Sequence, residues 1–176
     1  MIDAKGYRPN VGMIIINKEN KVFWGKRAGQ KSWQFPQGGV DDNESLVEAM
    51  YRELREETGL KPEHVELVSQ TTDWLFYDLP KRYRRKNHLP LCVGQKQQWF
   101  ILRLLVDDDA FDFNCSNKAE FDGFRWVDYW YPIRKVIYFK RDVYHTALNE
   151  LCEAVGIRPR RRLSPYRYRK KSKYKG

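Results

Sequence analysis

The chain has 176 residues, of which 41% are hydrophobic and 15% aromatic, a composition that fits one globular domain and excludes a disordered chain. No apolar run approaches the roughly 20 residues of a membrane-spanning helix, and the polar N-terminus does not resemble a signal peptide. The net charge of +10 belongs to the C-terminus, because ten of the 33 basic residues lie in 157–176 and the remaining 23 equal the acidic residues in number.

Three cysteines, Cys92, Cys115 and Cys152, lie far apart in the sequence, and no C-x-x-C pair is present. This pattern excludes a disulfide-stabilised secreted domain and argues against a structural zinc site. We therefore expect reduced cysteines that contribute to packing, and a cytoplasmic location.

The N-terminal part of the chain predicts a buried hairpin. Residues 11–16 are almost continuously apolar, a polar Asn-Lys-Glu-Asn segment occupies 17–20, and apolar residues resume at 22–24. A helix is expected next, at about 45–58. Ser45 with Glu48 three positions later fits a capping box, and Gly59 stands where a helix needs a left-handed terminator.

The second half of the chain predicts strands followed by one more helix. Strand-like patterns cover three segments, 64–77, 97–106 and 120–126. A proline-bounded basic loop lies at 80–90, and a polar loop at 107–118. Apolar residues at helical spacing over 140–155 predict a terminal helix that packs against the sheet. Strands and helices follow one another without a regular repeat, which predicts a single mixed α/β domain.

The tail at 157–176 differs in composition from the rest of the chain. It contains ten basic residues, no acidic residue and no apolar periodicity, so we expect it to be disordered. Two interpretations remain open for this tail. It is either a solubilising end or an electrostatic tether to nucleic acid, in which its tyrosines could stack on bases.

One segment carries most of the chemical information. Residues 38–60 have the spacing G-x5-E-x7-R-E-L-x-E-E-x-G-L. Glu53, Glu56 and Glu57 stand at i, i+3 and i+4, so that on a helix they share one face. Carboxylates this close repel one another unless a cation lies between them, and hard oxygen ligands favour Mg²⁺ or Mn²⁺ over zinc.

A simpler interpretation of the same face is a solvated acidic surface. Arg52 forms i,i+4 pairs with Glu48 and Glu56, which gives part of the charge a structural use. The number of specified positions in the whole segment favours the metal site over a chance match.

The segment resembles the Nudix box of hydrolases that act on nucleoside-diphosphate-linked compounds. Five further segments resemble the bacterial RNA pyrophosphohydrolase branch of that family: GYRPNVG (6–12), WQFPQGG (33–39), GQKQQWF (94–100), EFDGFRW (120–126) and FKRDVY (139–144). The likeness runs from about Tyr7 to about Glu150. It implies a Nudix-type α/β/α sandwich over 6–150, with a mixed sheet between helices, and a Mg²⁺- or Mn²⁺-dependent pyrophosphohydrolase activity.

The resemblance also implies roles for the acidic residues. Glu53, Glu56 and Glu57 would hold divalent ions, with Glu53 as the base that activates water and Glu57 as a further catalytic group. Arg52 would orient a helix glutamate and would itself be anchored by Glu44.

Further metal ligands are implied outside the helix. The backbone carbonyl of Gln37 or Gly38 would contribute, and so would Glu120, for which a surface glutamate at a strand edge is the alternative interpretation.

Eight residues are implied as substrate contacts. The 5′ phosphates would be approached by three cations and two neighbours of the box: Arg8, Arg27, Lys140, Ser32 and Trp33. Phe139 would stack on a nucleobase opposite Ile137, and the amide of Gln95 would bind polar groups of the substrate.

The function implied is removal of pyrophosphate or phosphate from 5′-triphosphorylated or diphosphorylated RNA, which leaves a 5′-monophosphate and promotes mRNA decay. One alternative is hydrolysis of dinucleoside polyphosphates such as diadenosine tetraphosphate. Another is a non-catalytic RNA-binding module that keeps the fold. Neither a membrane partner nor a preference for DNA is expected, and the sequence does not identify a protein partner.

Overall fold

The computed structural model describes residues 2–84 and 90–160. Most of the basic tail, from residue 161 onward, and part of the basic loop at 80–90 therefore lie outside the described residues. No helix among the described residues is long and apolar enough to cross a membrane.

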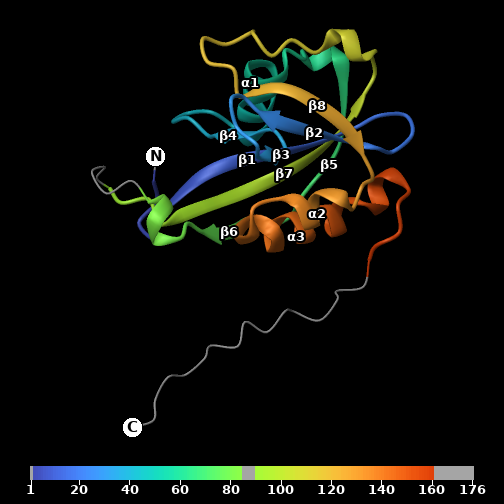
Figure 1. Cartoon of the computed structure of the whole chain (residues 1–176). Helices are drawn as coiled ribbons and strands as arrows, with labels where there is room; N and C mark the ends of the chain where they lie inside the picture. Colours follow the sequence, from blue (N-terminus) through green and yellow to red (C-terminus); the bar gives the residue numbers. More distant parts are fainter. Residues whose placement is uncertain (1, 85–89, 161–176) are drawn as a thin grey trace.

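A mixed sheet of eight strands forms the centre of the described structure (Figure 1). The strands are β1 (Tyr7–Ile16), β2 (Val22–Arg27), β3 (Trp33–Gln34), β4 (Gln37–Gly39), β5 (Val65–Gln70), β6 (Leu75–Asp78), β7 (Gly94–Leu104) and β8 (Phe121–Val127). The main path runs β3-β2-β1-β7-β5, while β4 pairs with β1, β6 with β7 and β8 with β2. The β1–β7 pair is parallel and every other pair is antiparallel.

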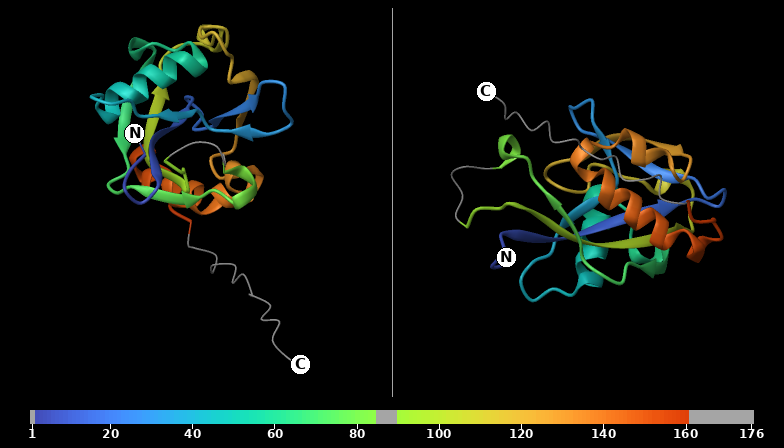
Figure 2. Two further views of the ribbon diagram at one scale, coloured as in Figure 1. Left: turned by 90° about the vertical axis from the view of Figure 1, so that its left-hand side faces the viewer. Right: turned by 90° about the horizontal axis from the view of Figure 1, so that it is seen from below.

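Helices cover both faces of this sheet, as Figures 1 and 2 show. Helix α1 (Leu46–Thr58) lies on one face, and α2 (Tyr131–Lys135) and α3 (Arg141–Leu151) lie on the other. Five short 3₁₀ turns connect the elements, at Pro62–His64, Lys81–Tyr83, Asp108–Ala110, Tyr138–Lys140 and Glu153–Val155. The α/β/α arrangement confirms the predicted fold class.

The two faces of the sheet are built by residue alternation along its central strand. Val11, Met13 and Ile15 of β1 enter the core beneath α1, while Ile14 and Ile16 enter the core beneath α3. Because β1 is buried on both faces, its sequence is a continuous apolar run rather than an alternating one. The hairpin predicted from that run is present, with Ile16 paired to Val22.

The signals at the ends of α1 are confirmed. The Ser45 hydroxyl accepts from the Glu48 backbone N–H, and the Glu48 carboxylate accepts from the Ser45 N–H, which completes the capping box. Gly59 ends the helix at φ 76°, in the left-handed region, and its N–H donates to the carbonyl of Arg55. These caps fix the start and end of the helix that carries the acidic residues.

Two expectations need correction. The terminal helix is shorter than 140–155, because α3 spans only Arg141–Leu151 and a 3₁₀ turn follows. The segment 107–118 is not simply a polar loop, since Phe111 and Phe113 pack against the core beneath α1. A pattern of isolated aromatic residues among polar ones has no period, so the sequence did not reveal this anchoring.

Candidate active site

Arg52 is the centre of the polar network on α1. Its guanidinium donates from Nε and Nη2 to both carboxylate oxygens of Glu44, at 2.7 and 2.8 Å. Nη2 also donates to the Gly39 carbonyl at 2.8 Å, and Nη1 donates to Glu53 at 2.8 Å. The hydrogen bonds to Arg52 lower the pKa of Glu44, so this carboxylate is charged and holds the loop after β4 against the helix.

Glu53 lies against the backbone of β4. A Cβ added to Gly38 would meet the Glu53 carboxyl carbon at 1.8 Å, so only glycine leaves room for the carboxylate at this point. Burial raises the pKa of Glu53, and the adjacent Arg52 opposes that rise. The Glu53 carboxylate therefore lies directly against the backbone of Gly38.

Glu56 and Glu57 occupy different environments. The Glu56 side chain is 49% exposed, and its carboxylate lies 3.5 Å from Nη1 of Arg52. Glu57 is buried and accepts a hydrogen bond from the Gln37 N–H at 2.9 Å. Burial raises the pKa of Glu57 well above its usual range, and Glu120 and Glu53 add to the rise.

Glu120 belongs to the site through tertiary structure alone. It precedes β8, and its carboxylate accepts from Nε of Arg27 at 3.1 Å and from the Gln34 amide at 3.2 Å. Its charge is close enough to contribute to the raised pKa of Glu57. The structure therefore brings Glu120 to the α1 carboxylates from a distant part of the sequence.

Within the part of the chain that the structure describes, no group of three or more His, Cys, Asp or Glu side chains converges as a closed metal shell. Glu53 and Glu56 form ion pairs with Arg52, whereas Glu57 accepts a hydrogen bond from the backbone of β4. The residues nevertheless fit a divalent cation. Glu57 is a buried carboxylate with nearby negative charges, and the space that a Cβ of Gly38 would fill is occupied by the carboxylate of Glu53.

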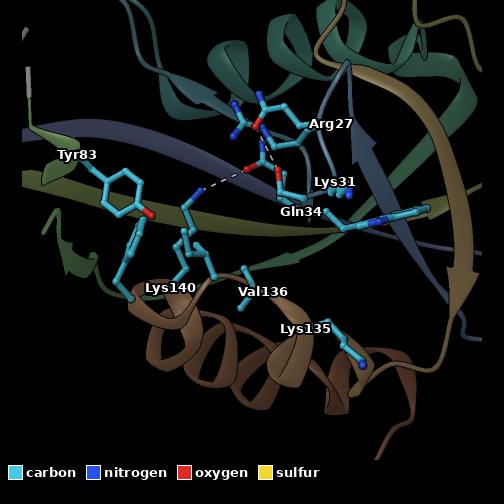
Figure 3. Close-up of a pocket in the computed structure, with 12 residues that line it drawn as sticks. Arg27, Lys31, Gln34, Tyr83, Lys135, Val136 and Lys140 are labelled. Carbon is cyan, nitrogen blue, oxygen red and sulfur yellow. Dashed lines mark hydrogen bonds between the residues drawn. The ribbon is translucent and has the colours of Figure 1, made fainter.

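A cleft of about 450 Å³ opens beside this acidic group. Figure 3 shows Arg27, Lys31 and Gln34 on one side of it and Lys135, Val136 and Lys140 on the other. Six predicted substrate contacts line the cleft: Arg27, Ser32, Trp33, Ile137, Phe139 and Lys140. Its lining holds four cationic side chains and no acidic one among the described residues. The cleft is therefore suited to an anion that carries a flat apolar group.

Lys140 connects the cleft to the acidic group. It is buried, and its Nζ donates to the side-chain oxygen of Gln34 at 3.3 Å (Figure 3). The same Nζ donates to the side-chain oxygen of Gln37 at 3.0 Å. Burial and the nearby Arg27 lower the pKa of Lys140 to about 8, against the opposing effect of Glu120 and Glu57.

The remaining predicted contacts have varied environments. Phe139 packs between Tyr77 and Tyr83, with ring centroids at 5.8 and 5.3 Å, and Ile137 is exposed at the edge of the cleft. The Trp33 ring lies beneath the guanidinium of Arg125 at 4.7 Å. The Ser32 hydroxyl donates to the Gln30 side chain at 3.3 Å.

Arg8 and Gln95 do not line the cleft. They are neighbours across the parallel β1–β7 pair, and the Arg8 guanidinium lies against Gly39 at the end of β4. Gln95 accepts from the Gln97 amide at 3.4 Å. These two residues are therefore close to each other but belong to another part of the surface around the acidic group.

Sequence reasoning missed several residues of the cleft. Gln34 and Tyr83 both line it, and the remaining unpredicted members are Gln30, Lys31, Lys135 and Val136. Gln34 lay inside the WQFPQGG segment that was already singled out, so that segment could have revealed it. Lys135 and Val136 end the short helix α2, whose five residues are too few to show a period.

Comparison with known proteins agrees with this geometry. The model of the NUDIX domain family matches residues 6–146. An RNA pyrophosphohydrolase from Thioalkalivibrio sulfidiphilus is 58% identical over 151 residues, which cover 86% of this chain and 87% of the relative. An RNA pyrophosphohydrolase from Shewanella frigidimarina is 52% identical over 98% of this chain and 100% of its own length.

Solved structures show the same fold at low identity. The dihydroneopterin triphosphate pyrophosphohydrolase of E. coli superposes with a TM-score of 0.63 at 18% identity, covering 80% of this chain and 95% of that chain. A C. elegans Ap4A hydrolase in a binary complex gives a TM-score of 0.60 at 18% identity, covering 84% and 97%. These likenesses concern the fold and carry no information about the substrate of this chain.

Replacing Arg52 by Lys should lower the free energy of unfolding by about 1–3 kcal/mol, because a lysine cannot reproduce the paired hydrogen bonds to Glu44. Urea denaturation measures this change. Lys21→Ala, which removes the exposed ion pair with Asp128, is the control and should cost less than about 1 kcal/mol. Equal losses for the two variants would show that the Arg52 network contributes no more than a surface pair.

Proposed function

The chain belongs to the NUDIX domain family, and from this we propose that it is an RNA pyrophosphohydrolase that converts 5′-triphosphorylated or diphosphorylated RNA ends to 5′-monophosphates. Support comes from the relatives named RNA pyrophosphohydrolase, which match this chain over most of both lengths. One observation carries the proposal: the cationic cleft lies directly beside the cluster of glutamates. Lys140 of the cleft binds Gln34 and Gln37, and these two residues bind Glu120 and Glu57.

Each half of the site suits one part of such a substrate. The cleft offers Arg27 and Lys140 to phosphate oxygens, and Phe139 and Ile137 to the flat face of a nucleobase. Ser32 and Trp33 line the same cleft, on the side of Arg27. We assign Arg8 and Gln95 to contacts with the substrate outside the cleft, near Gly39.

The acidic half suits a divalent cation. The proposed ligands are the carboxylates of Glu53, Glu56, Glu57 and Glu120 with a backbone carbonyl of Gln37 or Gly38. Mg²⁺ or Mn²⁺ bound there would offset the charge of phosphate oxygens and favour attack of water on phosphorus. The protein's own contribution is to hold these oxygens in place, and Arg52 does so by fixing Glu53 and Glu44 at once.

Glu53 is the proposed general base. Its carboxylate is largely buried yet is kept charged in part by the adjacent Arg52, so it is available to accept a proton. Glu57 is more deeply buried, and its hydrogen bond to the Gln37 N–H ties α1 to β4, which makes it the better candidate for positioning and for metal binding. Removal of the terminal phosphates would expose transcripts to ribonucleases that prefer a 5′-monophosphate. We therefore propose a role in mRNA decay in the cytoplasm.

A short triphosphorylated RNA incubated with Mg²⁺ should yield 5′-monophosphorylated RNA together with pyrophosphate or phosphate. In Glu53→Gln the turnover number should fall about 10²–10⁴-fold, the usual loss on removal of a general base. Glu63→Gln, at an exposed glutamate of a 3₁₀ turn, is the matched control and should keep full activity. Chromatographic analysis of the products measures both.

Two outcomes of that assay would contradict the proposal. Undiminished metal-dependent turnover in Glu53→Gln would remove the catalytic assignment. Preferential hydrolysis of diadenosine tetraphosphate, added in competition with the RNA, would replace RNA by a dinucleoside polyphosphate as the substrate.

Gly38→Ala should weaken Mn²⁺ binding about 10-fold or more, because a Cβ at this position displaces the Glu53 carboxylate. The free energy of unfolding should change little, since that carboxylate ends a flexible side chain. Gly123→Ala is the control, because a Cβ there meets nothing within 4 Å. Electron paramagnetic resonance of Mn²⁺ measures the affinity, and an unchanged value in Gly38→Ala would place the cation elsewhere.

Phe139→Ala should reduce kcat/KM for triphosphorylated RNA about 5- to 150-fold, the loss expected for one base–aromatic stack. Hydrolysis of free nucleoside triphosphates should suffer less. Phe139→Leu, which preserves apolar packing against Tyr77 and Tyr83, separates stacking from packing. Equal losses on both substrates in Phe139→Ala would indicate that Phe139 is only structural.

A further inference from the structure

Aromatic side chains continue from Phe139 beyond the cleft. The ring of Tyr83 lies 5.3 Å from that of Phe139, and the ring of Tyr138 lies 5.4 Å from it at a nearly perpendicular angle of 88°. Tyr83 is 44% exposed and Tyr138 is 50% exposed. Phe139 packs against the core beneath α3, and the two tyrosines contact that core through this ring and leave about half of their own surface exposed.

A guanidinium lies between the two tyrosines. Cζ of Arg82 is 4.9 Å from the centre of the Tyr83 ring and 6.0 Å from that of the Tyr138 ring. The planar cation thus contacts two exposed rings, and it forms no ion pair with a carboxylate of the described residues. A cationic, aromatic and exposed surface of this kind matches the chemistry of single-stranded nucleic acid, which presents base faces and phosphates in alternation.

The position of this group follows from the cleft. Tyr83 lines the cleft near Lys140, whereas Tyr138 lies outside its lining (Figure 3). The three residues come from two 3₁₀ turns, Lys81–Tyr83 and Tyr138–Lys140, that meet at Phe139. A chain that leaves the cleft over Phe139 and away from the carboxylates therefore passes over Tyr83, Arg82 and Tyr138.

We propose that Tyr83, Arg82 and Tyr138 form a second stacking site, which binds a nucleobase of single-stranded RNA located 3′ of the base held in the cleft. This inference rests on the proposed function, since it assumes that the 5′ end of an RNA occupies the cleft. Stacking is tolerant of sequence because every base has a π-face. The site therefore selects for the length of the RNA chain rather than for its sequence, and it favours RNA over free nucleotides.

Tyr138→Ala tests the site without altering the cleft lining. We compare a nucleoside triphosphate with a triphosphorylated RNA of six nucleotides that begins with the same nucleotide. The KM for the RNA should rise about 5- to 30-fold, and that for the nucleoside triphosphate less than about twofold, because only the RNA has a second base that reaches Tyr138. Tyr138→Phe keeps the ring and should restore the wild-type KM. Phe76→Ala, at an equally exposed ring on β6, is the control, and its effect on KM should be the same for both substrates.

A rise in KM of equal size for the nucleoside triphosphate and the RNA would show that Tyr138 is structural, and an unchanged KM for both would show that the ring is unused. Both results overturn the proposal.

Failure of the proposed function has a separate signature, namely that the wild-type protein does not hydrolyse the RNA. Fluorescence anisotropy with a 5′-monophosphorylated six-nucleotide RNA then tests the site without catalysis. A dissociation constant about 5-fold or more higher in Tyr138→Ala supports the stacking site, and an unchanged constant overturns it.

Discussion

The site depends on one guanidinium. Four acidic residues form ion pairs with Arg52: Asp41 and Glu44 from the loop after β4, and Glu53 and Glu56 from α1. Without Arg52, the mutual repulsion of these carboxylates would push the loop away from the helix. Arg52 binds Glu44 with two nitrogens and Glu53 with a third, and it also donates to the backbone carbonyl of Gly39, the last residue of β4. A planar cation with five donors can make all these bonds at once, which a lysine cannot. Helix, loop and carboxylates are therefore fixed together before any cation or substrate binds.

Two glutamines separate the acidic half of the site from the basic half. The side chain of Gln34 donates from its nitrogen to Glu120 and accepts from Lys140 at its oxygen. The side-chain oxygen of Gln37 accepts from Lys140, and the backbone N–H of Gln37 donates to Glu57. A direct ion pair between Lys140 and a carboxylate would neutralise both groups and hide them from a substrate. An amide both donates and accepts, so it satisfies each charged group with a neutral partner. The cation and the carboxylates therefore stay close together while their charges remain available to phosphate and metal.

The sequence predicted what depends on local spacing and failed where tertiary contacts decide. The capping box at Ser45 and the terminator at Gly59 are local, and both are present. Helical spacing placed Glu53, Glu56 and Glu57 on one face, but their directions follow partners elsewhere, since Glu57 turns to β4 while Glu56 stays exposed. The family resemblance indicated half of the residues that line the cleft. It did not indicate that Arg8 and Gln95 lie apart from the cleft, because strand register is a property of the whole sheet.

Under the proposal above, the exposed tyrosines beside the cleft would affect the binding of the substrate and not the reaction at phosphorus. The cations of the cleft, with a divalent cation held by the acidic residues of α1, would be sufficient to bind a polyphosphate. A mononucleotide would fill the cleft volume of about 450 Å³. Leaving two aromatic rings half exposed forgoes burial that would stabilise the fold. The Tyr138 ring lies outside the cleft lining, so under the proposal above it would add affinity only for a substrate that extends beyond the cleft. Binding energy from that distant part can increase the selectivity for RNA chains without any change in the groups that act on phosphorus.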